Sequence, residues 1–187
     1  MIRTRRLAAI LAADVVGFSA LMERDEEGTV RRVHDLRTSH VDPLLQERRG
    51  RLVKTTGDGF LAEFASPIAA VGFAIDLQTG LNRIPDGLRL RIGINQGDII
   101  VEEDGDVYGE GVNVAARLEA LCEPGGVLVS GKIYGEVRAR STPRSRTRAS
   151  STSRTSRNWC TSSPSASRAP TARQPRPSGR PRWHPGP

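Results

Sequence analysis

The sequence predicts an α+β domain over residues 1–140, in which helices pack on an antiparallel-rich, ferredoxin-like sheet. Short apolar runs bounded by turns alternate with longer segments whose apolar residues recur every three to four positions, which indicates strands and amphipathic helices in one chain. Tight turns join neighbouring strands, so those neighbours are antiparallel. Neither GxGxxG nor GxxxxGK[ST] occurs, which argues against a doubly wound nucleotide fold.

The first expected strand is the apolar run from Leu7 to Val16, LAAILAADVV. A continuous apolar run is typical of a central strand covered on both faces. Asp14 falls at its carboxyl end, where a buried carboxylate is costly unless it is paired or binds a metal. The alternative is that Asp14 caps the following helix.

The stretch Leu52–Phe64, LVKTTGDGFLAEF, predicts a β-hairpin with its tip at Gly57–Asp58–Gly59. The turn requires glycine for its positive φ angles, but it does not require a lysine four residues before an aspartate. Lys54 and Asp58 are therefore either solvated charges or part of a site.

The remaining elements follow from periodicity and turn residues. We expect one amphipathic helix over Glu23–Arg48, bent at Pro43, and a second over 66–81 with Ser66 as its N-cap and Pro67 in its first turn. A strand over 88–95 is expected to turn at Gly97–Asp98 into a partner strand, 99–101. The other expected elements are a helix from Gly111 to Cys122, a strand over 127–129 and a last helix over 131–138.

Residues 141–187 differ from the rest in composition. They contain 10 Arg, 11 Ser, 8 Pro and 6 Thr in 47 positions, and no Lys, Asp or Glu, so we expect a disordered tail. The net charge of +7 belongs to this tail, because the 28 basic residues less these 10 leave 18 against 21 acidic ones. A basic arm for nucleic acid or acidic lipid is one interpretation. A frame-shifted translation of a GC-rich gene is another, and translating the other two frames tests it.

Cysteine content and hydropathy indicate the cellular compartment that we expect for the protein. The two cysteines, Cys122 and Cys160, imply no disulfide framework, and no apolar run reaches membrane-spanning length. We therefore expect a cytoplasmic protein in which Cys122 is a small buried side chain at a helix end.

Four polar features are expected to converge in this fold: Asp14 at a strand end, Asp58 at a hairpin tip, Asp106 before a turn, and Asn113 with Arg117 on one helix face. Two converging carboxylates suit Mg²⁺ or Mn²⁺, which prefer oxygen ligands. Arginine commonly stabilises developing phosphate charge.

The segments AADVVGFS (12–19), VKTTGDGFLAEF (53–64), RIGINQGDII (91–100) and DVYGEGVNVAARLE (106–119) resemble the class III nucleotidyl cyclases, over roughly residues 6–138. The resemblance implies that Asp14 and Asp58 bind two Mg²⁺ or Mn²⁺ ions with the carbonyl of Val15. It also implies that the Val16–Ser19 turn, with Gly17, Phe18 and Ser19, lies against the triphosphate of ATP.

The resemblance further implies that Lys54 and Asp106 select the purine, and this pair is of the adenylate-forming type. Asn113 and Arg117 match the pair that orients the ribose and stabilises the transition state. The implied reaction is conversion of ATP to cyclic AMP and pyrophosphate.

By the same resemblance the site forms in a head-to-tail homodimer, with the metal site and Lys54 from one protomer and the Asn113/Arg117 half from its partner. Family members continue into further strands with a basic residue near the phosphates, and residues 141–187 depart from that pattern. Lys132 is not assigned this role. The alternatives are a non-catalytic cyclase-like dimerisation or nucleotide-sensing module and a nucleic-acid binder acting through the tail.

Overall fold

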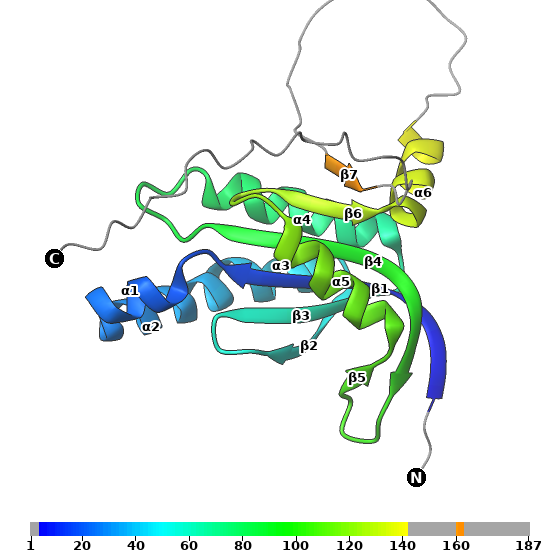
Figure 1. The fold of residues 1–187 in the computed structure, drawn as a ribbon, viewed down its shortest axis with the longest axis horizontal. Coiled ribbons are helices and arrows are strands. Elements are labelled where there is room, and N and C mark those ends of the chain that lie inside the picture. The colour runs from blue at the N-terminus through cyan, green and yellow to red at the C-terminus, as the bar shows by residue number, and fades with distance from the viewer. Residues whose placement is uncertain (1–3, 142–159, 163–187) are drawn as a thin grey trace, which may run out of the picture.

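The computed structural model describes residues 4–141 and 160–162, and within them seven strands form one curled sheet (Figure 1). The order is β2-β3-β1-β4-β6-β7, with β5 also paired to β4. The strands are β1 (Thr4–Val15), β2 (Gly50–Thr55), β3 (Gly59–Phe64), β4 (Leu90–Val101), β5 (Val107–Tyr108), β6 (Val127–Ser130) and β7 (Cys160–Ser162). The expected α+β class with an antiparallel-rich sheet is confirmed.

The centre of the sheet is β1, as its apolar run predicts. It pairs antiparallel with β3 on one side and along its whole length with β4 on the other. Residues from Ala8 to Ala13 are all buried because both faces of this strand are covered.

Helices cover the two faces of the sheet unequally (Figure 1). One face packs on α4 (Pro67–Leu81), α6 (Gly131–Ser141) and the helical segment that begins with α1 (Phe18–Arg24) and α2 (Glu26–Leu36). The other face carries α5 (Glu110–Leu121), which buries Ala115 against Ile10, Ala12 and Leu61. This second face, the α5 face, carries the candidate site.

The prediction of one helix over residues 23–48 is wrong. The structure has α1, α2, a π-helical turn η1 (Arg37–Val41) and α3 (Asp42–Glu47). Asp25 separates the first two, because its carboxylate accepts a hydrogen bond from the Gly28 amide at 2.9 Å and so begins a new helix. The helical period of the apolar residues continues across this break, which is why the pattern alone does not locate it.

The predicted turn at Gly97–Asp98 is also wrong, because β4 runs without interruption from Leu90 to Val101. Gly97 serves the packing of α5: a Cβ there would lie 2.8 Å from the Cα of Gly111. The partner of the strand end is β5, which pairs Tyr108 with Ile100.

Other predictions are confirmed with small changes. The 52–64 hairpin is β2–β3, and α4 starts at Pro67, although the Ser66 side chain makes no capping hydrogen bond. Cys122 is buried directly after α5. In the tail the structure describes Ser141 and β7, which runs parallel to β6, and the expected disorder otherwise lies outside the described residues.

Candidate active site

Asp14 and Asp58 meet at one end of the sheet. Asp14 is the penultimate residue of β1 and pairs with Gly59, the first residue of β3. The amide of Val15 donates to the carbonyl of Asp58 at 3.0 Å, which fixes the hairpin tip beside the end of β1. Gly59 permits this approach, because a Cβ there would lie 2.3 Å from the carbonyl oxygen of Ala13. Two acidic residues 44 positions apart in the chain are thus neighbours.

The two carboxyl groups interact directly. Burial, and then the side-chain hydrogen bond with Asp14 and its negative charge, raise the pKa of Asp58 above its ordinary value. Within the described residues no three Asp, Glu, His or Cys side chains group closely enough to hold a metal ion unaided. Two adjoining carboxylates nevertheless fit Mg²⁺ or Mn²⁺, which complete their coordination with water and phosphate oxygens.

A basic residue that sequence reasoning missed completes this end of the site. Arg91 of β4 pairs with Asp14 and also lies 3.3 Å from the carboxylate of Glu119 on α5. The hydrogen bond to Asp14 raises the pKa of Arg91. Burial, and then the charge of Asp14, raise the pKa of Glu119. The alternation of LRLRIGIN places Arg91 on a half-buried strand, but only the pairing of Asp14 with Arg91 across β1 and β4 shows its partner.

Lys54 and Asp106 form a second polar pair on the same face of the sheet. Lys54 pairs with Leu61, which packs in the cluster under α5, so its side chain is directed to that face. Its Nζ donates to Asp106 Oδ2 at 3.0 Å, and this hydrogen bond lowers the pKa of Asp106. Tyr108 joins the pair: its ring lies 5.2 Å from the ammonium group, and its hydrogen bond with Asp106 raises the pKa of Tyr108.

Asn113 and Arg117 lie one turn apart on α5, and both are exposed. Neither side chain makes a hydrogen bond or ion pair with another described residue. The structure therefore joins Asp14 to Asp58 and Lys54 to Asp106, and leaves Asn113 and Arg117 open to solvent on the helix that carries Glu119.

The turn after β1 is shorter than the expected one, because only Val16 and Gly17 lie in it. Gly17 adopts a left-handed conformation with φ of 69° and precedes α1, so Phe18 and Ser19 form the first residues of that helix. A cavity of about 230 Å³ borders this end of the sheet and is lined by Val15, Asp58 and Gly59 among others.

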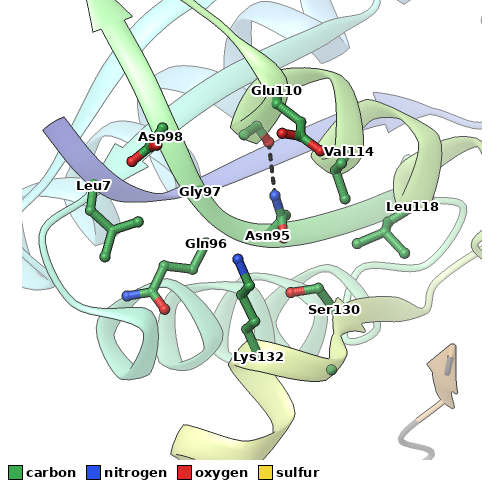
Figure 2. Close-up of a pocket in the computed structure, with 12 residues that line it drawn as sticks. Leu7, Asn95, Gln96, Gly97, Asp98, Glu110, Val114, Leu118, Ser130 and Lys132 are labelled. Atoms are coloured by element: carbon green, nitrogen blue, oxygen red, sulfur yellow. Dashed lines mark hydrogen bonds between the residues drawn. The ribbon is translucent and has the colours of Figure 1, made fainter. Parts of the chain in front are cut away.

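A larger cavity of about 650 Å³ lies elsewhere, between β4, the start of α5 and the junction of β6 with α6 (Figure 2). Gln96, Ser130 and Lys132 line it, and so does Asn95, whose Nδ2 donates to the carbonyl of Gly111 at the start of α5 at 3.2 Å. None of the site residues predicted from the sequence lines this cavity.

A curled, antiparallel-rich sheet with helices on both faces matches the fold of solved nucleotidyl cyclase structures. The model of the adenylate and guanylate cyclase catalytic domain matches residues 3–154, and the chain belongs to this family. The resemblance stated from the sequence motifs is thereby confirmed.

Named relatives agree with this assignment. The chain is 50% identical over 142 residues to putative adenylate cyclase 3 of Rhizobium meliloti, a match that covers 73% of this chain and 24% of that protein. It is 36% identical over 143 residues to an adenylate cyclase of Streptomyces coelicolor, covering 75% of this chain and 37% of the relative. The chain thus spans 24% and 37% of the length of these two curated relatives, well under half of either.

Solved structures show the same fold. The crystal structure of an adenylate/guanylate cyclase/hydrolase from Silicibacter pomeroyi matches with a TM-score of 0.69 and 44% identity, covering 75% of this chain and 85% of that chain. The adenylyl cyclase CyaB from P. aeruginosa matches with a TM-score of 0.66 at 22% identity, covering 74% and 84%, and shows the likeness of fold alone. In the part of the chain that the structure describes, no helix has the length and apolarity to cross a bilayer.

Proposed function

We propose that this domain is an adenylate cyclase, which converts ATP to cyclic AMP and pyrophosphate. The observation that carries the proposal is the convergence of Asp14 and Asp58, 44 residues apart, beside the guanidinium of Arg91. Two adjacent carboxylates and an arginine at one strand end are suited to a metal-bound triphosphate.

At the phosphate end, Asp14 and Asp58 would hold two Mg²⁺ or Mn²⁺ ions together with the carbonyl of Val15. When bound, such ions neutralise phosphate charge and lower the pKa of a coordinated hydroxyl. Arg91 forms an ion pair with Asp14 when no nucleotide is bound. Its guanidinium would move from that carboxylate to a phosphate oxygen when the nucleotide binds, so the positive charge of Arg91 would be paired in both states. Gly17 and the first residues of α1, Phe18 and Ser19, would lie along the triphosphate.

At the base end, Lys54 and Asp106 would select adenine. Lys54 donates to a ring nitrogen and Asp106 accepts from the exocyclic amine. A guanine presents a carbonyl where adenine has the amine, and a carboxylate repels that oxygen. Without a bound base, Lys54 Nζ donates to Asp106 Oδ2 at 3.0 Å, so the two charges compensate each other and the two side chains are held close together. A bound adenine would replace this contact.

The ribose and the transition state would be contacted by Asn113 and Arg117. In the reaction the 3′-oxygen forms a bond to the α-phosphorus, the bond from the α-phosphorus to the bridging oxygen breaks so that pyrophosphate leaves with the electron pair, and the proton of the 3′-hydroxyl is released to water. Arg117 stabilises the negative charge on the α-phosphate. Both side chains are exposed and lack partners among the described residues, which supports their use across a head-to-tail homodimer interface.

The test is cyclic AMP formation from ATP with Mn²⁺, measured by chromatography on the full chain. We expect Asp14→Ala to lower the rate by about two orders of magnitude, the scale on which loss of one electrostatic group acts in enzymes. Arg5→Gln is the matched control, because Arg5 forms an exposed ion pair with Asp98 away from the site. Equal rates in the wild type and Asp14→Ala would refute the proposal. Binding of ATP without turnover by the wild-type dimer would favour a nucleotide-sensing module instead.

A further inference from the structure

A buried carboxylate lies on β3 two residues from Leu61, the strand partner of Lys54. Glu63 of β3 is only 4% exposed, and it forms ion pairs with Arg6 of β1 and Arg51 of β2. A buried carboxylate is costly unless its charge is compensated, and here the two neighbouring strands each supply an arginine. Glu63 Oε2 accepts from Arg51 Nε at 3.2 Å and from Nη2 at 2.8 Å, so the guanidinium is held by two of its donors.

The third nitrogen of Arg51 reaches the loop that carries Asp106. Nη1 donates to the carbonyl of Gly105 at 2.8 Å, and Gly105 immediately precedes Asp106. One guanidinium thus connects a buried carboxylate in the sheet to the peptide unit next to the proposed base-recognition residue. The rigid fork of arginine allows this bridge, whereas a single ammonium group has no such geometry.

A β-bulge in β2 directs Arg51 and Lys54 to the same loop. In a regular strand, residues three apart lie on opposite faces. The register of β2 against β3 shifts between Leu52 and Lys54, so that Arg51 pairs with Glu63 and Lys54 pairs with Leu61. Glu63 and Leu61 are two residues apart on β3 and share a face, which places both basic side chains on the α5 face.

The two contacts differ in what happens when a base binds. The Lys54–Asp106 contact joins the very groups that would recognise adenine, so a bound base replaces it. The contact of Arg51 with Gly105 uses a backbone oxygen, so it persists in the complex. The loop is also closed internally by the Gly105 amide donating to the Glu102 carbonyl at 3.0 Å, and Arg51 joins this closed unit to the sheet.

We infer that Arg51, held by Glu63, is a positioning residue. It fixes the loop that carries Asp106, so that the Asp106 carboxylate stays where it can accept from the amine of adenine, and it thereby supports the preference for ATP over GTP. The inference rests on the proposed role of Lys54 and Asp106 in base recognition. Arg51 itself contacts neither base nor phosphate in this scheme.

The test compares Arg51→Gln, Arg51→Lys and the control Arg5→Gln in the full-length chain. The first readout is the ratio of ATP to GTP affinity, measured by calorimetry with Mn²⁺. We expect Arg51→Gln to reduce this ratio about tenfold, the value of one charge-assisted hydrogen bond. Arg51→Lys keeps a positive charge beside Glu63 but cannot also reach Gly105. We therefore expect its thermal unfolding midpoint to equal that of the wild type, while its ratio of ATP to GTP affinity stays as low as in Arg51→Gln.

The second readout is amide hydrogen exchange, which needs no nucleotide. Exchange at Gly105 and Asp106 is expected to rise in both Arg51 variants and to stay at the wild-type rate in Arg5→Gln. A folded Arg51→Gln protein that keeps the wild-type affinity ratio would overturn the inference, as would an equal loss in Arg5→Gln or a wild type without preference for ATP. A wild type that prefers ATP but forms no cyclic AMP would refute the proposed enzyme while leaving this test intact.

Discussion

Replacing Gly93 with alanine tests how closely α5 packs on the sheet. Gly93 lies in β4 between Ala12 of β1 and Leu128 of β6, so the strand is held on both sides. A Cβ at this position would lie 2.2 Å from the amide nitrogen of Glu119 and 2.3 Å from the carbonyl oxygen of Ala115. Both atoms belong to the backbone of α5, so no side-chain rotation relieves the overlap.

The expected loss of stability in Gly93→Ala follows from the distance by which α5 must move away from the sheet. Ordinary contact begins at 3.4 Å, so α5 has to move away by about 1 Å. That movement opens the cluster of Ala115, Ile10 and Ala12, and overpacking of this kind costs about 3 kcal/mol. For a domain of this size the unfolding midpoint should fall by about 10 °C.

The assay is thermal unfolding followed by circular dichroism, with Gly135→Ala as the control. Gly135 lies in α6, and a Cβ added there would meet no atom of the described residues within 4 Å outside the backbone of its own helix, so alanine should stabilise the helix by about 0.5–1 kcal/mol. Because Glu119 moves with α5, we also expect cyclase activity in Gly93→Ala to fall by more than the folded fraction does. An unfolding midpoint within about 2 °C of the wild type would contradict the packing described here.

The remaining predictions concern the core, the base-recognition pair and the exposed face of α5. Phe73 is fully buried between Phe60 and Phe64, so Phe73→Ala should cost about 3–5 kcal/mol in chemical denaturation, and a loss below about 1 kcal/mol would contradict its place in the core. Lys54 lowers the pKa of Asp106 in the folded state; the pair therefore stabilises the fold above the unfolded-state pKa, and this contribution is lost as the pH falls through the lower folded-state value. The unfolding midpoint of Asp106→Asn should consequently change less than that of the wild type between about pH 5 and pH 2, and identical pH profiles would count against the ion pair. Asn113→Ala and Arg117→Ala should abolish cyclic AMP formation and leave the unfolding midpoint within about 2 °C of the wild type, because both side chains are exposed, and a large loss of stability would indicate a structural role instead.

Local chemistry made part of this structure predictable. The central strand follows from an apolar run ending at Asp14, and the hairpin follows from Gly57–Asp58–Gly59. Both predictions depend on residues close together in the sequence. They assign Asp14 to the end of a strand and Asp58 to the tip of a hairpin. The break at Asp25 could not be predicted from periodicity, because the apolar pattern continues through it while the side chain caps a new helix.

The residues missed by sequence reasoning are those whose partners depend on strand register. Arg91 meets Asp14 only because β4 pairs with β1 along its whole length. Arg51 shares a face with Lys54 only because β2 contains a bulge. The sequence predicts a turn at Gly97, but the small size of this residue serves the close approach of Gly111. Each of these contacts is set by pairing or packing between distant segments, which a single sequence does not specify.

The central claim is that Asp14 and Asp58 hold divalent cations against the phosphates of a nucleotide. Its most direct measurement is the calorimetric affinity for ATP with Mn²⁺ and with EDTA, in the wild type and in the double variant Asp14→Asn/Asp58→Asn. We expect Mn²⁺ to strengthen ATP binding by the wild type at least about tenfold and to have no such effect on the folded double variant. Equal strengthening in both proteins would contradict the account.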